Sequence, residues 1–165
     1  MVVLRNWQKQ IIDDFPAIVK QHRRFILKAP TGAGKTILAS EIVDQFYKGK
    51  KILVLCHRLV LLEQLQKALS VRHSVHKLSV SEDGKAFDGY DILLSTNMRA
   101  KDVLEEAIKM ADLIIVDEAH RVSPNGSGYK KILEDFENEG KVGAQFMGLT
   151  ACLLYTSPSP RDSCA

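Results

Sequence analysis

The 165-residue chain is predicted to form an α/β domain, a mostly parallel sheet with helices on both faces. Short apolar runs of strand length alternate with longer stretches of helical periodicity. The short runs are apolar throughout, which is typical of strands buried on both faces of a sheet. Ligands bind beyond the carboxyl ends of strands in such sheets, so the residues that follow each strand are the first candidates for a functional site.

The first half of the chain supplies the first helices and strands. Apolar residues recur at three- and four-residue spacing, which predicts helices at 7–20, 35–47 and 59–69. Uninterrupted apolar runs predict strands at 25–29 (FILKA), 51–56 (KILVLC) and 75–80. Gly49 marks the turn between the second helix and the second strand.

The second half repeats the alternation after a polar turn, SEDGKAFDG. The expected elements are a strand at 91–95 (DILLS), a helix at 101–110, a strand at 113–117 (LIIVD), a loop rich in proline, glycine and serine at 123–128, a helix at 129–137 and a strand at 144–150 (AQFMGLT). This order of strands and helices completes the pattern of a parallel sheet.

Composition limits the class of protein. The chain is 45% hydrophobic and 26% charged, which is typical of a soluble globular protein. We expect no membrane anchor, no secretory signal and a cytoplasmic location, because no apolar run approaches the roughly 20 residues of a membrane span. Three cysteines give neither a disulfide framework nor metal-ligand spacing. A net charge of +3 leaves a nucleic-acid partner open.

The first strand end carries the stretch APTGAGKT, residues 29–36. A phosphate-binding loop needs glycines whose backbone N–H groups face inward, a lysine for the β and γ phosphates, and a hydroxyl for Mg²⁺. Gly32, Gly34, Lys35 and Thr36 supply these parts at a strand-to-helix junction. The alternative is a flexible glycine-rich turn, and Ala29 departs from the glycine that usually opens the pattern.

A second strand end carries LIIVDEAH, residues 113–120. Asp117 is expected to hold the metal through its water shell, and Glu118 to orient or deprotonate the attacking water. The alternative is an acidic turn that caps the next helix. His120 is either a structural histidine or a link between the γ-phosphate and a bound nucleic acid.

With these two motifs, the chain resembles the first RecA-like domain of a superfamily 2 DEAH-type helicase or translocase, over residues 4–151. The nearest group contains the type III restriction motor subunits and the repair and phage helicases. VDEAH matches motif II residue for residue, which adds His120 to the catalytic residues. APTGAGKT matches motif I, whose family form commonly begins with alanine. The motif implies that Thr31, Gly32, Ala33, Gly34, Lys35 and Thr36 bind the nucleotide.

Four further stretches follow in the order of this group. LRNWQ at 4–8 resembles its N-terminal element, which implies that Gln8, with Arg5, reads adenine. CHRLVLLEQ at 56–64 resembles motif Ia, which implies that His57 and Arg58 contact the nucleic-acid backbone. STNMRA at 95–100 loosely matches motif Ib; Ser95 and Thr96 then bind phosphate or simply cap a helix. GLTA at 148–151 matches motif III, with Thr150 coupling ATP state to strand binding.

The resemblance implies ATP and Mg²⁺ as cofactors, nucleic acid as partner, with DNA preferred to RNA, and a second RecA-like domain in the same polypeptide. Since that second domain supplies arginines to the ATP site, the chain alone is expected to be nearly inactive. Alternatives are a nucleotide-gated nucleic-acid clamp, a restriction-complex motor subunit that does not unwind, and a small phosphotransferase that uses the same loop.

The C-terminal stretch does not follow the group. GLTA usually continues as GLTATP, whereas CLLYTSPSPRD follows here. That string resembles the translation of a transposase adapter used in sequencing-library preparation. We therefore expect residues 152–165 to be a non-native, disordered tail on an incomplete domain, 1–151. The alternative is a linker rich in serine and proline.

Overall fold

The computed structural model describes residues 4–30, 34–56, 59–71, 73–77, 87, 89–96, 101–117 and 129–152. Its helices are α1 (Asn6–Gln21), α2 (Lys35–Phe46), α3 (Leu59–Ser70), α4 (Lys101–Met110) and α5 (Tyr129–Glu139). Its strands are β1 (Arg24–Pro30), β2 (Ile52–Cys56), β3 (Val75–Lys77), β4 (Ile92–Thr96), β5 (Leu113–Asp117) and β6 (Gln145–Cys152). None of these helices is long and apolar enough to cross a membrane.

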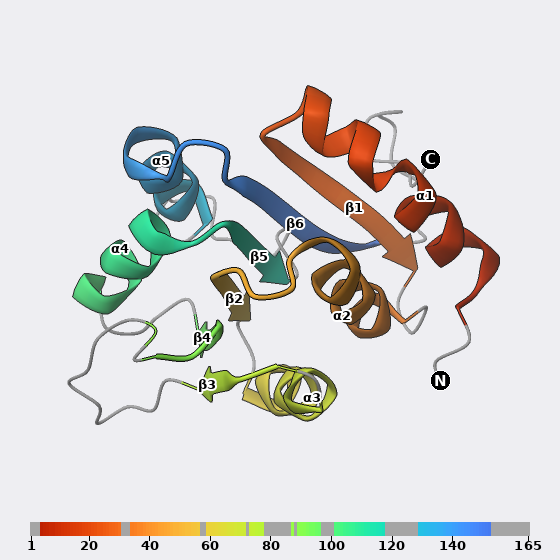
Figure 1. Cartoon of the computed structure of the whole chain (residues 1–165), viewed down its shortest axis with the longest axis horizontal. Helices are drawn as coiled ribbons and strands as arrows, with labels where there is room; N and C mark the ends of the chain where they lie inside the picture. Colours follow the sequence, from red (N-terminus) through yellow and green to blue (C-terminus); the bar gives the residue numbers. More distant parts are fainter. Residues whose placement is uncertain are drawn as a thin grey trace.

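The described strands form one six-stranded sheet in the order β1-β6-β5-β2-β4-β3 (Figure 1). Every pair of neighbouring strands is parallel. The predicted fold class is therefore confirmed, and each predicted helix and strand has its counterpart in the structure. The predicted strand at 75–80 is described only through Lys77.

The last strand extends one residue into the predicted tail. β6 continues to Cys152, whose backbone pairs with that of Pro30 in β1. Backbone pairing does not depend on which side chain a residue carries, so this extension leaves the origin of the tail untested. Residues 153–165 lie outside the described residues.

Helices cover both faces of the sheet, which explains why the strands are apolar throughout. Alternate strand residues point to opposite faces. Val54 packs in the core beneath α1, α2 and α3, whereas Leu55 packs in the core beneath α4 and α5. On the first face Phe15 of α1 meets Phe25 of β1 edge to face, with 5.7 Å between ring centroids. The result is a three-layer arrangement (Figure 1).

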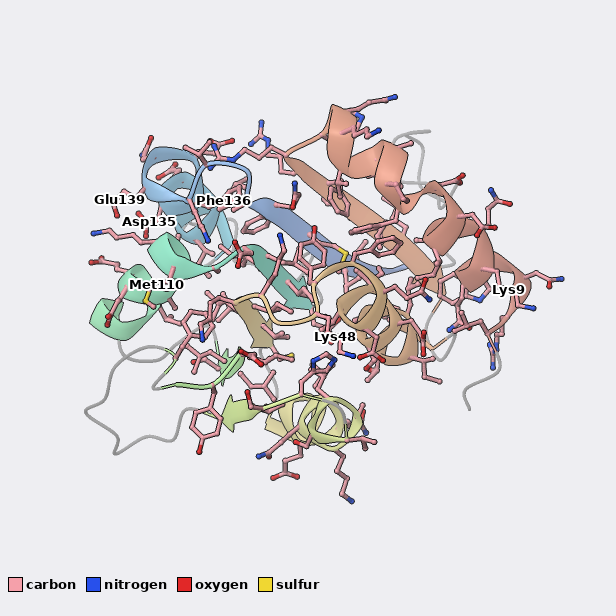
Figure 2. All side chains as sticks on the ribbon, in the orientation of Figure 1. Lys9, Lys48, Met110, Asp135, Phe136 and Glu139 are labelled. Atoms are coloured by element: carbon pink, nitrogen blue, oxygen red, sulfur yellow. The ribbon has the colours of Figure 1, made fainter. Side chains whose placement is uncertain are left out.

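The amphipathic helix α5 is fixed to both β6 and β1. Its Phe136 is fully buried with its ring 5.4 Å from that of Phe146, while Asp135 and Glu139 lie on its outer side (Figure 2). The Arg23 guanidinium lies 4.5 Å from the Phe136 ring centroid and donates to the Gly140 carbonyl at 3.3 Å. A cation at the C-terminal end of a helix is stabilising. Arg23 thus has a structural role in joining β1 to α5.

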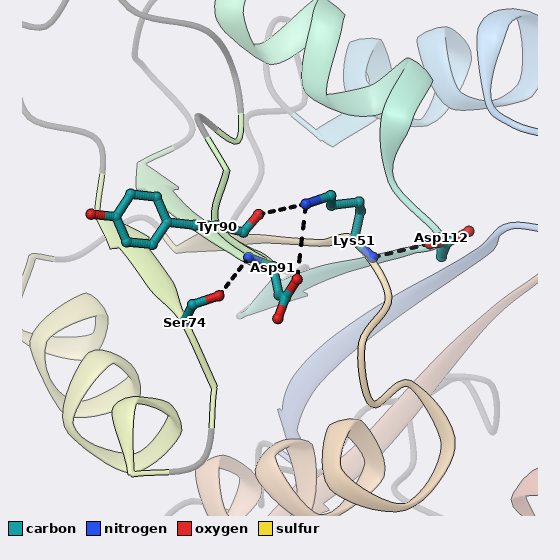
Figure 3. A network of polar contacts seen from close by, with 5 residues as sticks. All are labelled: Lys51, Ser74, Tyr90, Asp91 and Asp112. Carbon is teal, nitrogen blue, oxygen red and sulfur yellow. Dashed lines mark hydrogen bonds and ion pairs between the residues drawn. The ribbon is translucent and has the colours of Figure 1, made fainter.

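A polar network holds the other edge of the sheet, where β2, β4 and β5 begin (Figure 3). The Asp112 carboxylate accepts from the Lys51 backbone N–H at 3.0 Å and from Lys141 Nζ at 2.7 Å. Lys51 Nζ donates to the Tyr90 carbonyl at 2.9 Å and lies 3.9 Å from an Asp91 oxygen. These contacts connect the starts of neighbouring strands.

Ionisation of Asp112 is favoured by this network. Burial of the carboxyl opposes ionisation, but the hydrogen bonds from Lys141 and Lys51, with the charges of Lys141 and Lys50, lower the Asp112 pKa below its ordinary value. Near it, burial raises the pKa of the Tyr47 hydroxyl, and the Asp112 charge adds to that effect. Tyr47 therefore stays protonated and donates to Gln145 Oε1 at 2.8 Å.

Replacing Asp112 should destabilise the fold in a pH-dependent way. Asp112→Ala leaves the Lys51 N–H without its acceptor, so the free energy of unfolding at pH 7 should fall by about 1 to 3 kcal/mol. Because the folded pKa is lowered, the wild-type advantage is present above the ordinary aspartate pKa of about 3.9 and is lost as pH falls through the lower folded value. Urea denaturation at a series of pH values measures this difference.

Asp13→Ala, an exposed aspartate of α1, is the matched control and should change stability little at any pH. An Asp112→Ala deficit that stayed the same size from pH 7 down to pH 3 would show that the carboxylate charge contributes nothing.

Candidate nucleotide-binding site

The carboxyl ends of β1, β6 and β5 form the edge at which the candidate site lies. β6 lies between β1 and β5 in the sheet. The helix α2 begins at Lys35, shortly after β1 ends, and β5 ends at Asp117. Lys35 and Asp117 are far apart in the sequence. The parallel sheet brings the carboxyl ends of β1 and β5 to the same edge.

Lys35 and Asp117 meet at this edge. Lys35 Nζ lies 3.9 Å from Asp117 Oδ1, and the two side chains are 16% and 11% exposed. This separation is longer than the 2.7 to 2.9 Å of a direct charge-assisted hydrogen bond. A cation and a carboxylate therefore face each other in a sheltered position without a tight direct bond.

The start of α2 has the backbone geometry that glycine allows. Gly34 is the N-cap of α2 with φ of +94°, in the left-handed region. Its carbonyl accepts the first hydrogen bond of the helix, from the Leu38 N–H at 3.1 Å. The free N–H groups and the dipole of a helix N-terminus favour an anion. The predicted phosphate-binding residues 31–33 lie outside the described residues.

Gln8 makes a contact with this glycine that sequence reasoning missed. Its Nε2 donates to the Gly34 carbonyl at 2.9 Å, and its Oε1 accepts from the Arg5 N–H at 2.7 Å. Gln8 is 2% exposed, whereas Arg5 is exposed. These bonds leave one N–H and one lone pair of the amide for a further partner. The role of Gln8 and Arg5 in reading adenine stays a prediction.

A pocket extends from this edge along the side of α2 that faces α3. Thr36 of α2 and Asp117 of β5 lie among its lining residues, and the remaining lining is apolar. The apolar members are Ala39, Val43, Val54, Leu65, Leu69, Ile115 and Leu149. The two predicted metal-binding side chains thus line one pocket.

The oxygen atoms of Thr36 and Asp117 fit a magnesium ion better than a transition metal. Mg²⁺ takes oxygen ligands, usually one or two from the protein with the rest from phosphates and water. Within the described ranges, no group of three or more histidine, cysteine, aspartate or glutamate side chains could hold a metal by itself. A metal here would therefore need a nucleotide or water to complete its coordination.

Of the other predicted site residues, some are described in the structure and the rest are not. Ser95 is fully buried in β4, where it pairs with Leu55, and this burial favours a structural role over contact with a phosphate. Thr150 is 8% exposed in β6 beside Lys28 of β1, and Thr96 ends β4. The predictions for Thr31, Gly32, Ala33, His57, Arg58, Glu118 and His120 fall outside the described residues.

Residues 1–154 match the family described as type III restriction enzyme, res subunit. The chain belongs to this family. A resemblance to the helicase group that contains type III restriction motor subunits, drawn above from the motifs, is thereby confirmed. The described site residues, from Gln8 to Thr150, all lie within the matched range.

Two curated proteins are similar to this res-subunit domain over most of its length. A protein of Sulfolobus islandicus filamentous virus (isolate Iceland/Hveragerdi), provisionally named helicase 22, is 29% identical over 154 residues, 85% of this chain and 27% of that protein. The type I restriction enzyme EcoAI endonuclease subunit of Escherichia coli is 30% identical over 152 residues, 84% of this chain and 18% of that protein. The chain thus spans about a quarter or less of the length of these relatives.

A solved structure supports the fold. The Sulfolobus solfataricus SWI2/SNF2 ATPase core in complex with dsDNA has a TM-score of 0.67 to this chain at 21% identity. The match covers 99% of this chain and 34% of the other. The res-subunit domain therefore shares its fold with part of that ATPase core.

Proposed function

We propose that this chain is the nucleotide-binding first lobe of an ATP-dependent nucleic-acid helicase or translocase. The observation that carries the proposal is the approach of Lys35 Nζ to Asp117 Oδ1, 3.9 Å apart at the carboxyl edge of the sheet. In a magnesium-nucleotide site, a lysine that binds phosphate and a carboxylate that supports the metal face each other, and the positions of Lys35 and Asp117 fit these two roles.

Each side chain has a distinct role in this proposal. Lys35 and the N–H groups at the start of α2 bind the β and γ phosphates, and Gly34 lets the backbone turn toward them. Thr36 and Asp117 would hold Mg²⁺, which neutralises charge on the phosphates when it is bound. Glu118 orients the attacking water, and His120 and Thr150 link the phosphate state to a bound strand.

Gln8 is proposed to read the adenine base with its remaining N–H and lone pair, with Arg5 beside it. Its bond to the Gly34 carbonyl, at 2.9 Å, would then join base recognition to the phosphate-binding turn. His57, Arg58 and Thr96 are proposed contacts to the nucleic-acid backbone.

A second lobe in the same polypeptide is proposed to complete the ATP site. Arginines supplied to such sites contribute roughly a thousand- to a hundred-thousandfold to turnover. The chain alone should therefore bind nucleotide but hydrolyse it very slowly. The relatives, of which this chain spans 27% and 18%, are long enough to hold further domains.

DNA is the proposed nucleic acid, and the cytoplasm the proposed compartment. The similar SWI2/SNF2 core was solved with double-stranded DNA, and the EcoAI relative is a restriction endonuclease subunit. The names of these two proteins support DNA, rather than RNA, as the nucleic acid on which the parent protein acts.

Replacing Asp117 tests the metal assignment. Asp117→Asn should weaken the magnesium-dependent part of nucleotide affinity about 10- to 100-fold, as loss of a metal-supporting carboxylate does elsewhere. Titration of the chain with a fluorescent ATP analogue, with Mg²⁺ or with EDTA, measures this part directly. The variant and the wild type should bind alike in EDTA.

Asp112→Asn is the matched control, because Asp112 directly precedes the strand that Asp117 ends. It should lower stability and leave the magnesium dependence unchanged. If Asp117→Asn kept the full magnesium dependence, the nucleotide site would have to lie elsewhere.

A further inference from the structure

A largely buried pair of side chains joins α2 to the segment that follows α3. His73 Nε2 contacts Asp44 Oδ1, and these side chains are 5% and 15% exposed. A carboxylate oxygen accepts hydrogen bonds, so His73 is the donor of this contact when its Nε2 carries the hydrogen. The residues are 29 positions apart in the sequence, so this is a tertiary contact.

The position of Asp44 in α2 indicates that its carboxylate needs a hydrogen-bond donor. Asp44 lies in the last turn of α2, where the negative end of the helix dipole makes a carboxylate unfavourable. A sheltered donor such as His73 compensates for that cost. His73 itself is held in place, because its N–H donates to the Leu69 carbonyl at 2.9 Å and Ser74 accepts from the Asp91 N–H at 3.0 Å.

Between the site and this pair, a small pocket separates part of α2 from α3. The pocket described above lies between them, lined by Ala39 and Val43 of α2 and by Leu65 and Leu69 of α3. The lining of a void has already lost part of its van der Waals contacts, so a small change in the angle between the two helices costs less here than across a fully packed interface.

We propose that the His73–Asp44 pair positions α3 relative to α2 and makes α3 respond when nucleotide binds at the N-terminus of α2. The inference rests on the proposed function, because it assumes that nucleotide binds at Lys35. α2 acts as a rigid rod that carries Lys35 and Thr36 at one end and Asp44 at the other. A shift at the phosphate end then reaches α3 through His73.

The test uses the whole 165-residue chain and a non-hydrolysable ATP analogue with Mg²⁺. Backbone amide NMR shifts are recorded for α3 with and without the analogue, and its affinity is measured separately with a fluorescent nucleotide. In the wild type, the amides of α3 should shift on binding. His73→Phe, which keeps a ring but removes the donor, should lose most of that response while nucleotide affinity changes less than about threefold.

Three further variants separate positioning from stability. His73→Gln keeps an N–H donor and should retain the response of α3. Asp44→Ala removes the acceptor and should lose the response as His73→Phe does. Glu41→Gln removes a carboxylate from the same helix, where it accepts from Gln45 at 3.3 Å, and should respond like the wild type.

Each outcome decides between the inference and the proposed function. If the analogue does not bind the wild type, the proposed function fails and this inference fails with it. If it binds but the α3 amides of the wild type do not shift, the inference alone is overturned. It is also overturned if either His73→Phe or Asp44→Ala is folded, binds the analogue and retains the full response. If both variants fail to fold, an unshifted α3 in the nucleotide-bound wild type still overturns the inference.

Discussion

Lys35→Ala should weaken binding of a fluorescent ATP analogue by roughly ten- to a hundredfold, because hydrogen bonds to charged groups contribute about 1.5 to 3 kcal/mol each. The substitution also removes the cation that lies 3.9 Å from the Asp117 carboxylate. In a polypeptide that carries the second lobe as well, nucleic-acid-stimulated hydrolysis should be lost. Fluorescence titration and a phosphate-release assay measure the two effects.

Lys48→Ala is the matched control for charge. Lys48 is exposed, follows the end of α2 and is labelled in Figure 2. This variant should bind nucleotide as the wild type does. Equal affinity of Lys35→Ala and the wild type would refute the assignment of the phosphate site.

Gly34→Ala should impair both stability and nucleotide binding. At φ of +94° an alanine is strained by roughly 1 to 2 kcal/mol, and its Cβ would lie 2.8 Å from Gln8 Nε2. The side chain of Gln8 would have to move, and its bond to the Gly34 carbonyl would be lost. We expect a decrease of about 2 to 4 kcal/mol in the free energy of unfolding and at least tenfold weaker nucleotide binding.

Two variants separate backbone strain from the clash. Gly49→Ala has a comparable φ of +77° with nothing within 4 Å of the added Cβ, so it should show strain alone. The double variant Gln8→Ala with Gly34→Ala has no clash. Its loss in the free energy of unfolding should therefore be smaller than the sum of the losses of the two single variants. Urea denaturation measures the stabilities. Additive effects within about 0.5 kcal/mol would show that Gln8 and Gly34 are not coupled.

The sequence predicted the fold because each element carries its own local signal. Apolar runs such as Ile52–Cys56 stand out without reference to the rest of the chain. The insertion of β6 between β1 and β5 has no such signal, since strand order depends on packing between segments far apart. The rule that sites lie at strand ends nevertheless brought Lys35 and Asp117 together correctly.

Side-chain contacts between distant segments could not be predicted. The bond from Gln8 to Gly34 spans 26 positions, and the His73–Asp44 pair spans 29. Nothing near any of these residues in the sequence indicates its partner. Ser95 is another example, because nothing in the run that precedes it indicates that the structure buries it completely.

The place of β6 in the sheet determines when the site can be assembled during synthesis. β1 has no other strand partner among the described residues, so it can join the sheet only after Gln145–Cys152 has left the ribosome. The strands β2 to β5 can pair with one another before then. Lys35 is synthesised early, but it can face Asp117 only after the last strand has joined the sheet. A nascent chain halted before residue 145 should therefore not retain nucleotide.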